Sequence, residues 1–534
     1  MEMLGFPLSF RALFFGAALS VVVAAYSAFA GLKVGGVYWP IVTTSLVSLV
    51  FLLALGKTSK NEINIMQTAG SSGGLLAAGI IFTIPAAFMM GIEISYLQIL
   101  WISLIGGTLG IVFSYPLRKQ LIEREKLPCA DGTAAAAVIG AGDSGGRKAS
   151  TLMWSFGIGA AFSIARDWAK AIPAFVNLES LKIGAGKIFS FGSSVSLIPL
   201  AGGFLIGPRF TLAWFLGAIF TYFVIIPYAL TTGLFADKFS VLSGIGRPLG
   251  VGIVLGSAIV YFLLKGLPLM GRMVDDWKKA RAGRMAGLAM IICAGALTFV
   301  FNFGLPLSLL VIIGAFTMAY VGARSTAEMN VDPMEIFAML VLIVAKVFLG
   351  QAALPLVILA AIVTIAAGLA GDMMQDLKTG YLLGTKLEHQ IIAQAVGMIA
   401  ASIAIGAVLI AINSTHGLGS AEFPAPQAIA VKELVGSQGI SDILGFGIIA
   451  GAALTAMVSY GMPHLGLVAI AFGIGIYVPI ELSVPLFIGG LLRHAANSAN
   501  RTEHYRLVAA GAIAGEGLAG VAFSLVGFAF LLMK

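Results

Sequence analysis

Ionisable side chains separate two long apolar runs in the segment Gly371 to Gln390, GDMMQDLKTGYLLGTKLEHQ. Asp372, Asp376 and Lys378 follow the first run without an intervening proline. Such a cluster is either a solvated loop between two spans or a polar site inside the membrane. In a site, the carboxylates could hold an ammonium group or a proton, and the lysine could hold a carboxylate. The glycines of this segment would give an interrupted helix the backbone freedom it needs.

The composition defines the setting of this cluster. Of the 534 residues, 59% are hydrophobic and 10% are charged, and the mean hydropathy is +1.00. A soluble domain has about a quarter of its residues charged. The sequence therefore predicts an all-α polytopic protein that crosses a membrane many times, and we expect this to be the cytoplasmic (inner) membrane. With about 20 residues per span, the chain can hold about 16 transmembrane helices.

Several functional classes are disfavoured by the sequence. The net charge of +8 is spread over short loops, as the positive-inside rule explains, so we predict no nucleic-acid partner. The two cysteines and five histidines show no metal-ligand spacing, so we predict neither a metal site nor a cofactor. We find no nucleotide-binding loop or hydrolase motif, and we therefore predict that the chain is not an enzyme.

Two weak internal similarities recur at comparable offsets. LPCADGTAAAAVIG at Leu127 aligns with FPAPQAIAVKELVG at Phe423, where 423 − 127 = 296. NIMQTAG around Gln67 resembles DMMQDLKTG around Gln375, where 375 − 67 = 308. These matches indicate two homologous halves, although Ala/Gly-rich runs can also resemble each other by chance.

The proposed halves cover residues 1–270 and 271–534, and the basic stretch Arg272 to Arg284 is the candidate hinge between them. If each half has an even number of spans, the two should superpose by rotation about an axis near the membrane normal. The segments Leu127–Gly142 and Pro424–Gly436 are too short to span a membrane. We expect them to be re-entrant or interrupted helices that face each other near the middle of the protein.

Four stretches resemble the oligopeptide transporter family, which includes the yellow-stripe metal-chelate transporters, and in particular its prokaryotic branch. They are EKLPCADGTAAAAVI at Glu125, GDMMQDLKTGYLLGTK at Gly371, GIGIYVPIELSVPLFIGGLL at Gly473 and AGEGLAGV at Ala514. The resemblance covers nearly the whole chain. It implies a secondary active, proton-coupled importer of small peptides or peptide-like metal chelates.

The sequence departs from the family pattern at two places. Cys129 and Ala130 replace the aromatic residue and second proline of an LPYP-type motif. Gly73 and Gly74 stand where bacterial relatives often carry an acidic residue, so a proton-coupling role is not expected at that position.

A peptide-like substrate presents an ammonium, a carboxylate and amides, so its site needs carboxylates, a cation and neutral hydrogen-bonding groups. Asp131 and Thr133 could contribute to that site or could cap an interrupted helix. We expect the cluster after Gly371 to line a central polar cavity with Gln67. The substrate-binding candidates are Gln67, Asp131, Thr133, Asp372, Gln375, Asp376, Lys378 and Tyr381.

Three carboxylates are the candidates for proton coupling: Asp372, Glu481 and Glu516. The last two lie in otherwise apolar stretches, where a charge is unfavourable unless it is protonated, paired or hydrated. Glu481 could instead lie at a helix end between Pro479 and Pro485, where this cost is small.

The expected partners are a small-molecule substrate, protons and the lipid bilayer, and homo-oligomer formation is left open. A passive channel and an intramembrane enzyme with an aspartate pair are the alternatives to a transporter. A channel cannot accumulate its solute, and the enzyme would need a second aspartate on a facing span.

Overall fold

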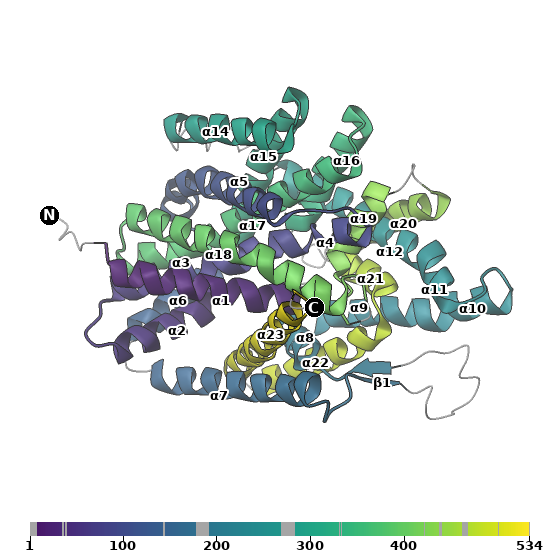
Figure 1. The fold of residues 1–534 in the computed structure, drawn as a ribbon, viewed down its shortest axis with the longest axis horizontal. Helices are drawn as coiled ribbons and strands as arrows, with labels where there is room; N and C mark the ends of the chain where they lie inside the picture. The colour runs from purple at the N-terminus through teal and green to yellow at the C-terminus, as the bar shows by residue number, and fades with distance from the viewer. Residues whose placement is uncertain are drawn as a thin grey trace.

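The computed structural model describes residues 8–34, 37, 40–141, 145–177, 192–268, 283–329, 332, 334–420, 422–436, 441–461, 468–499 and 501–532. Helices make up most of this part of the chain (Figure 1). β1 (Phe175–Asn177) pairs antiparallel with β2 (Gly192–Ser194), and Phe175 lies opposite Ser194. The candidate hinge lies outside the described residues except for its last two positions.

The helices before the candidate hinge are α1 (Phe10–Val34), α2 (Ile41–Ala54), α3 (Lys60–Ile81), α4 (Pro85–Met89), α5 (Tyr96–Ser114), α6 (Ala130–Ala141), α7 (Gly145–Ser163), α8 (Leu197–Ile206), α9 (Pro208–Phe220), α10 (Ile226–Thr231), α11 (Lys238–Val241) and α12 (Arg247–Tyr261). The helices after it are α14 (Gly283–Phe301), α15 (Leu305–Met329), α16 (Met334–Leu349), α17 (Ala353–Leu383), α18 (Leu387–His416), α19 (Pro426–Gly436), α20 (Asp442–Gly461), α21 (Val468–Tyr477), α22 (Ile480–Ser498) and α23 (Thr502–Leu532). Short 3-10 or π turns extend several of them: η1 (Tyr115–Leu117), η2 (Lys119–Arg124), η4 (Ile164–Trp168), η6 (Thr221–Ile225), η7 (Leu242–Gly246) and η8 (Phe262–Gly266).

Ten helical segments of the described chain are long and apolar enough to cross a membrane, and five further apolar helices are shorter. The prediction of an all-α polytopic membrane protein is confirmed. The count of about 16 spans is not confirmed, because several apolar helices are shorter than the roughly 20 residues that a span needs.

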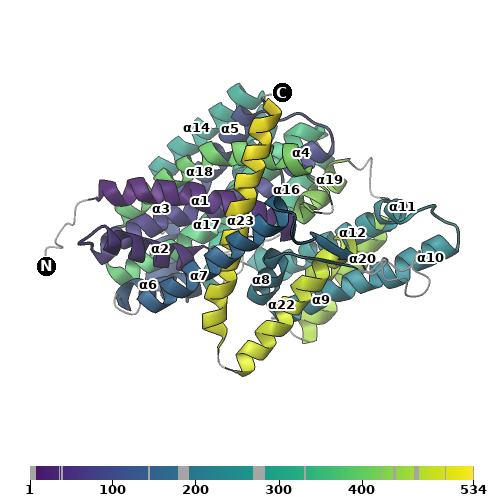
Figure 2. The same ribbon diagram turned by 60° about the horizontal axis from the view of Figure 1, so that its bottom comes forward.

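The helices form two groups that appear in both ribbon views. α1, α3, α5, α17 and α18 pack together in one group, and α9, α12 and α20 to α22 pack together in the other (Figures 1 and 2). α7 and α23 pack along each other, and α23 also contacts α1, α8 and α18. α17 lies at the centre of the first group, and its side chains are buried without interruption from Leu356 to Gly380.

The short segments around α6 and α19 are helices, of 12 and 11 residues. Each is preceded by a non-glycine residue with positive φ, Cys129 at 41° and Ala425 at 45°. The backbone N–H of Cys129 donates to the carbonyl of Ala327, and that of Ala425 donates to the carbonyl of Leu32, both at 2.9 Å. A backbone hydrogen bond thus connects the residue before α6 to the C-terminal end of α15. Another connects the residue before α19 to the C-terminal end of α1.

Four close contacts between a glycine and a backbone carbonyl connect α8 and α9 with α21 and α22 of the second helix group. Each places a glycine close to a carbonyl oxygen of the neighbouring helix: Gly203 to Leu486, Gly475 to Trp214, Gly489 to Leu200 and Gly217 to Phe472. The differences 475 − 203, 486 − 214, 489 − 217 and 472 − 200 are all 272. α8 therefore contacts α22 as α21 contacts α9, which is the relation that a two-fold axis produces.

The directions of the helices show how a two-fold axis between the two parts of the chain would lie relative to the membrane. α3 and α17 are antiparallel, because Gln67 contacts Asp376 while Gly79 packs against Ile365. α1 runs parallel to α3, and α15 runs parallel to α17. α1 and α15 therefore run in opposite directions across the membrane. A rotation about the membrane normal keeps every helix direction, so the predicted axis does not fit the antiparallel α3 and α17, which carry the matched Gln67 and Gln375 motifs.

The same directions correct the expectation that the two short segments face each other. Since α1 and α15 are antiparallel, the ends to which α19 and α6 are bound lie at opposite ends of the helix group. The entry turns of the two segments therefore lie apart rather than opposite each other.

We expect Gly203→Ala and Gly475→Ala to lower the melting temperature by similar amounts. An added Cβ would collide with the Leu486 or Trp214 carbonyl oxygen, and overpacking of this kind costs about 1–3 kcal/mol. Gly157→Ala on α7 is the matched control, because no atom lies within 4 Å of its added Cβ. Thermal unfolding of the detergent-purified variants measures the effect, and a neutral Gly475→Ala beside a destabilising Gly203→Ala would contradict the equivalence.

Candidate functional site

The polar cluster lies inside a continuous helix. α17 extends to Leu383 and ends where Gly384 takes the left-handed conformation, with φ 78°. Asp372, Gln375 and Asp376 have no exposed surface, and Lys378 is 9% exposed. The alternative of a solvated loop is therefore wrong for this part of the segment. The expected central cavity is not open to solvent at these side chains.

Asp376 receives hydrogen bonds from three neighbouring side chains. Gln67 of α3 donates from Nε2 to Oδ1 at 2.5 Å, and Ser71 donates from Oγ to Oδ2 at 2.6 Å. The amide of Gln394 on α18, oriented with its nitrogen toward Asp376, donates to Oδ2 at 3.1 Å. This carboxylate is thus enclosed by α3, α17 and α18, and its negative charge is well satisfied.

Asp372 lies one helical turn before Asp376, on the same face of α17. Ser71 and Gln394 face it from α3 and α18. Within the described chain, however, neither of its carboxylate oxygens has a hydrogen-bond partner. A buried charged group without a partner is strongly unfavourable in a membrane interior. Asp372 is therefore the less satisfied carboxylate of the pair.

Three side chains of α17 hold the turn that leads into α6. Gln375 accepts from the Gly132 N–H at 2.9 Å and donates to the Thr326 carbonyl at 3.1 Å. Lys378 donates to the Leu127 carbonyl, and Thr379 to the Gly132 carbonyl, each at 2.9 Å. The two motifs quoted for the family resemblance are thus in direct contact through backbone groups.

The remaining substrate-binding candidates lie at the edge of this cluster. Thr133 is exposed, and its hydroxyl donates to the Pro128 carbonyl at 2.9 Å, which stabilises its own turn. Asp131 lies half-buried in the first turn of α6. Tyr381 is 42% exposed, and the Arg118 guanidinium lies 5.6 Å from its ring centroid.

Glu481 lies at a helix end, which is the alternative to a position within an apolar stretch. It is in the first turn of α22, two residues after Pro479, the residue that precedes this helix. Its carboxylate lies 3.9 Å from the Lys238 ammonium, and its side chain is 18% exposed.

Glu516 of α23 is fully buried but has several donors. It accepts from Arg166 and from the Ser196 hydroxyl at 2.6 Å, and from the backbone N–H groups of Leu197 and Ile198 at 2.7 and 3.2 Å. Arg166 also forms a two-pronged pair with Asp167 at 2.7 Å. This cluster ties α23 to η4 and to the start of α8. It lies apart from the Asp372 pair.

Sequence reasoning missed Ser71, Gln394 and Arg166. Ser71 and Gln394 are uncharged and have no periodic neighbours that would mark them. Arg166 and Asp167 could have been found, because adjacent opposite charges directly follow the apolar residues of α7. In the described ranges, no group of three His, Cys, Asp or Glu side chains is placed to hold a metal ion.

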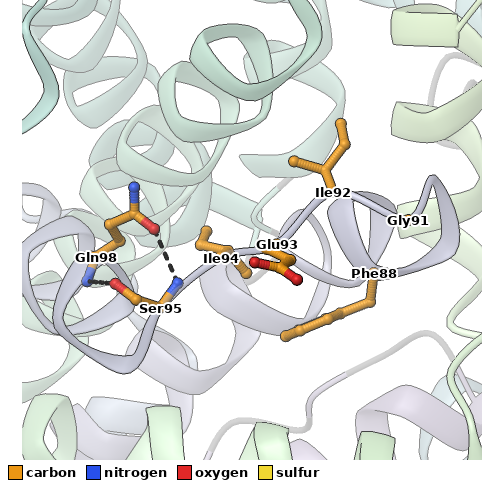
Figure 3. A pocket seen from close by; sticks show the side chains of 7 residues that line it. All are labelled: Phe88, Gly91, Ile92, Glu93, Ile94, Ser95 and Gln98. Carbon is orange, nitrogen blue, oxygen red and sulfur yellow. Dashed lines mark hydrogen bonds between the residues drawn. The ribbon is translucent and has the colours of Figure 1, made fainter.

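A cavity of about 580 Å³ lies at the turn between α4 and α5. Figure 3 shows its Glu93 side chain beside the reciprocal hydrogen bonds of Ser95 and Gln98, which cap α5. Of its seven lining residues only Glu93 is charged, and none of our candidates lines it: Phe88, Gly91, Ile92, Glu93, Ile94, Ser95 and Gln98.

Comparison with known proteins gives consistent matches. The family described as "OPT oligopeptide transporter protein" matches residues 7–273 and 278–526. A Haemophilus influenzae protein named "Putative oligopeptide transporter" is 27% identical over 587 aligned positions, which cover 93% of this chain and 92% of the relative. A Saccharomyces cerevisiae protein with the same descriptive name is 24% identical over 272 positions, which cover 46% of this chain and 37% of the relative.

Proposed function

The chain belongs to the OPT oligopeptide transporter family, and we propose that it is a secondary active, proton-coupled importer of small peptides or peptide-like metal chelates. Its location would be the cytoplasmic membrane. The relatives' names support transport of oligopeptides. Proton coupling and inward direction are our proposal.

The buried carboxylate pair on α17 is the observation that supports coupling. Two carboxylates one turn apart in a dry site are not readily ionised together, so one of them holds a proton. Asp376 has three donors and Asp372 has none. We therefore assign the transported proton to Asp372. Release of this proton would leave a charge that only a hydrated or rearranged site can accept.

We expect the substrate to bind where side chains of α17 contact the turn before α6. Gln375 and Lys378 are already bonded to backbone groups of the segment entering α6. A peptide offers the same amide and carboxylate groups, so it can compete for these side chains when the turn moves. In this mechanism, movement of the α6 entry would couple peptide binding to the environment of Asp372.

Two related halves of opposite orientation would suit such a mechanism. The exchanged contacts of α8 with α22 and of α9 with α21 support an inverted repeat. Transporters built in this way switch access by moving one repeat unit against the other around a site near the midplane. The halves would divide near residue 270, with α14 as an additional helix between the repeated units.

Uptake by proteoliposomes that contain the purified full-length chain tests the function. We expect a panel of labelled short peptides and metal chelates to include at least one solute that accumulates only under an inward proton gradient. The gradient is imposed in one set of vesicles and collapsed with a protonophore in the other.

Three results would contradict the proposal. Equal uptake with and without the gradient would indicate a passive channel. Accumulation driven by another ion would contradict proton coupling. No uptake of any solute, by a protein that remains folded in the vesicles, would contradict peptide and chelate transport.

A further inference from the structure

A second cavity, of about 450 Å³, has charges of both signs on its wall. It lies between η4, the end of α18, the loop that follows α18, and α23. The wall residues that matter here are Arg166, Asp167, Lys170, His416, Glu422 and Phe523. None of them is among the candidates drawn from the sequence.

This cavity is far from the carboxylate pair. Gln394 of α18 faces Asp376, and His416 is the last residue of the same helix. Their separation in sequence, 416 − 394 = 22 residues, corresponds to about 33 Å at 1.5 Å per residue. This length is comparable to the roughly 30 Å hydrocarbon layer of a bilayer. The cavity therefore lies toward the opposite membrane face.

Neighbouring groups stabilise the charged form of Glu422, the acidic residue on the other side of the cavity. Glu422 lies 3.4 Å from both the Lys33 ammonium and His416 Nδ1. Burial would raise the pKa of Glu422, but the hydrogen bond with His416 and the charge of Lys33 lower this pKa to about 2. His416 is itself packed against the rings of Phe423 and Phe523. Its Nε2 atom is buried and has no hydrogen-bond partner in the described structure.

The basic side combines a buried and an exposed cation. Arg166 is 3% exposed, and its guanidinium is oriented by hydrogen bonds to Asp167, Glu516 and the Val195 carbonyl. Lys170 is exposed, and its ammonium lies 5.5 Å from the Phe523 ring centroid. A ligand that enters the cavity therefore meets the Lys170 ammonium beside the Arg166–Asp167 pair on one side, and the Glu422 carboxylate and the Phe523 ring elsewhere on the wall. Its volume lies within the range of about 300–1,000 Å³ that is usual for small-molecule sites.

We propose that this cavity binds a short peptide by both of its charged ends, with the ammonium at Glu422 and the carboxylate at Arg166 and Lys170. The inference rests on the proposed function and adds to it an initial binding site on the membrane face opposite the Asp372 pair. Charges of both signs explain why a zwitterion fits better than a simple anion or cation. The cavity at α4 and α5 lacks this property, because Glu93 is its one charged wall residue.

Equilibrium binding of labelled trialanine, N-acetyl-trialanine and trialanine amide to the purified full-length protein tests this site. For the natural chain, we expect blocking of either end of the peptide to weaken binding by about tenfold. Glu422→Gln should weaken trialanine by about tenfold but leave N-acetyl-trialanine unchanged. Lys170→Ala should weaken trialanine by about fivefold and leave the amide unchanged. Glu93→Gln is the control and should bind all three peptides as the natural chain does.

The pattern across peptides separates recognition from damage to the fold. A variant that weakens all three peptides equally would contradict the assignment of that residue to one end of the ligand. Lys170 is exposed, so its variant remains informative if Glu422→Gln does not fold. If the natural chain accumulates trialanine in vesicles but the pattern is absent, this site is wrong and the transport function stands. If it neither binds nor accumulates any of the three, both proposals fail for peptides.

Discussion

Asp372→Asn is expected to abolish accumulation of substrate while leaving the amount of folded protein unchanged. The Asp372 carboxylate has no hydrogen-bond donor in the described structure, so an amide of the same shape removes no existing contact. The substitution does remove the carboxylate that we propose to carry the transported proton. A carrier without coupling only equilibrates its substrate, so the ratio of internal to external solute should fall to about one. Exchange of labelled for unlabelled substrate should continue.

Asp376→Asn is the matched comparison on the same helix face. Asp376 accepts from Gln67, Ser71 and Gln394. An amide has one acceptor atom in place of two, so at least one buried donor loses its partner, at a cost of about 1–3 kcal/mol. We expect lower thermal stability for this variant and unchanged stability for Asp372→Asn. Full accumulation by a folded Asp372→Asn protein would overturn the assignment of the proton.

The contact between Gln67 and Asp376 shows what the sequence could predict. Gln67 and Asp376 lie in the two similar motifs NIMQTAG and DMMQDLKTG. A charged residue next to a long uncharged run also needs a partner if it is buried. This reasoning led to Gln67, Gln375 and the two aspartates, which the structure brings together on α3 and α17. It could not identify Ser71 or Gln394, because an uncharged polar side chain in an apolar run has no distinguishing pattern.

The orientation of the helices was beyond the same reasoning. Hydropathy measures how long an apolar run is, but it does not show whether the run crosses the membrane or returns. α6 and α19, of 12 and 11 residues, are too short to cross. One additional or missing crossing reverses every later helix, so hydropathy alone could not predict that α3 and α17 run in opposite directions. The pairing of Glu516 with Arg166 was hidden for another reason, because 350 residues separate them.

Arg166→Met should cause the largest loss of stability among the variants considered. Arg166 is 3% exposed, and its guanidinium bonds to the carboxylates of Asp167 and Glu516. Removing the cation leaves both carboxylates buried without it, and breaking a buried pair in this way costs about 3–5 kcal/mol. Glu516 also accepts from the first N–H groups of α8, so α8 should lose its attachment to α23 at the same time.

Two further variants distinguish this explanation from a general effect of removing arginine. Arg11→Met breaks the pair with Glu62, in which the Arg11 side chain is 34% exposed, so we expect a change of about 1 kcal/mol or less. Glu516→Gln combined with Arg166→Met removes one of the two uncompensated charges and should restore part of the lost stability. Thermal unfolding of the purified proteins measures all three. If Arg166→Met melts like Arg11→Met, or if the double variant is no better than Arg166→Met alone, the buried charges are not what holds α8, η4 and α23 together.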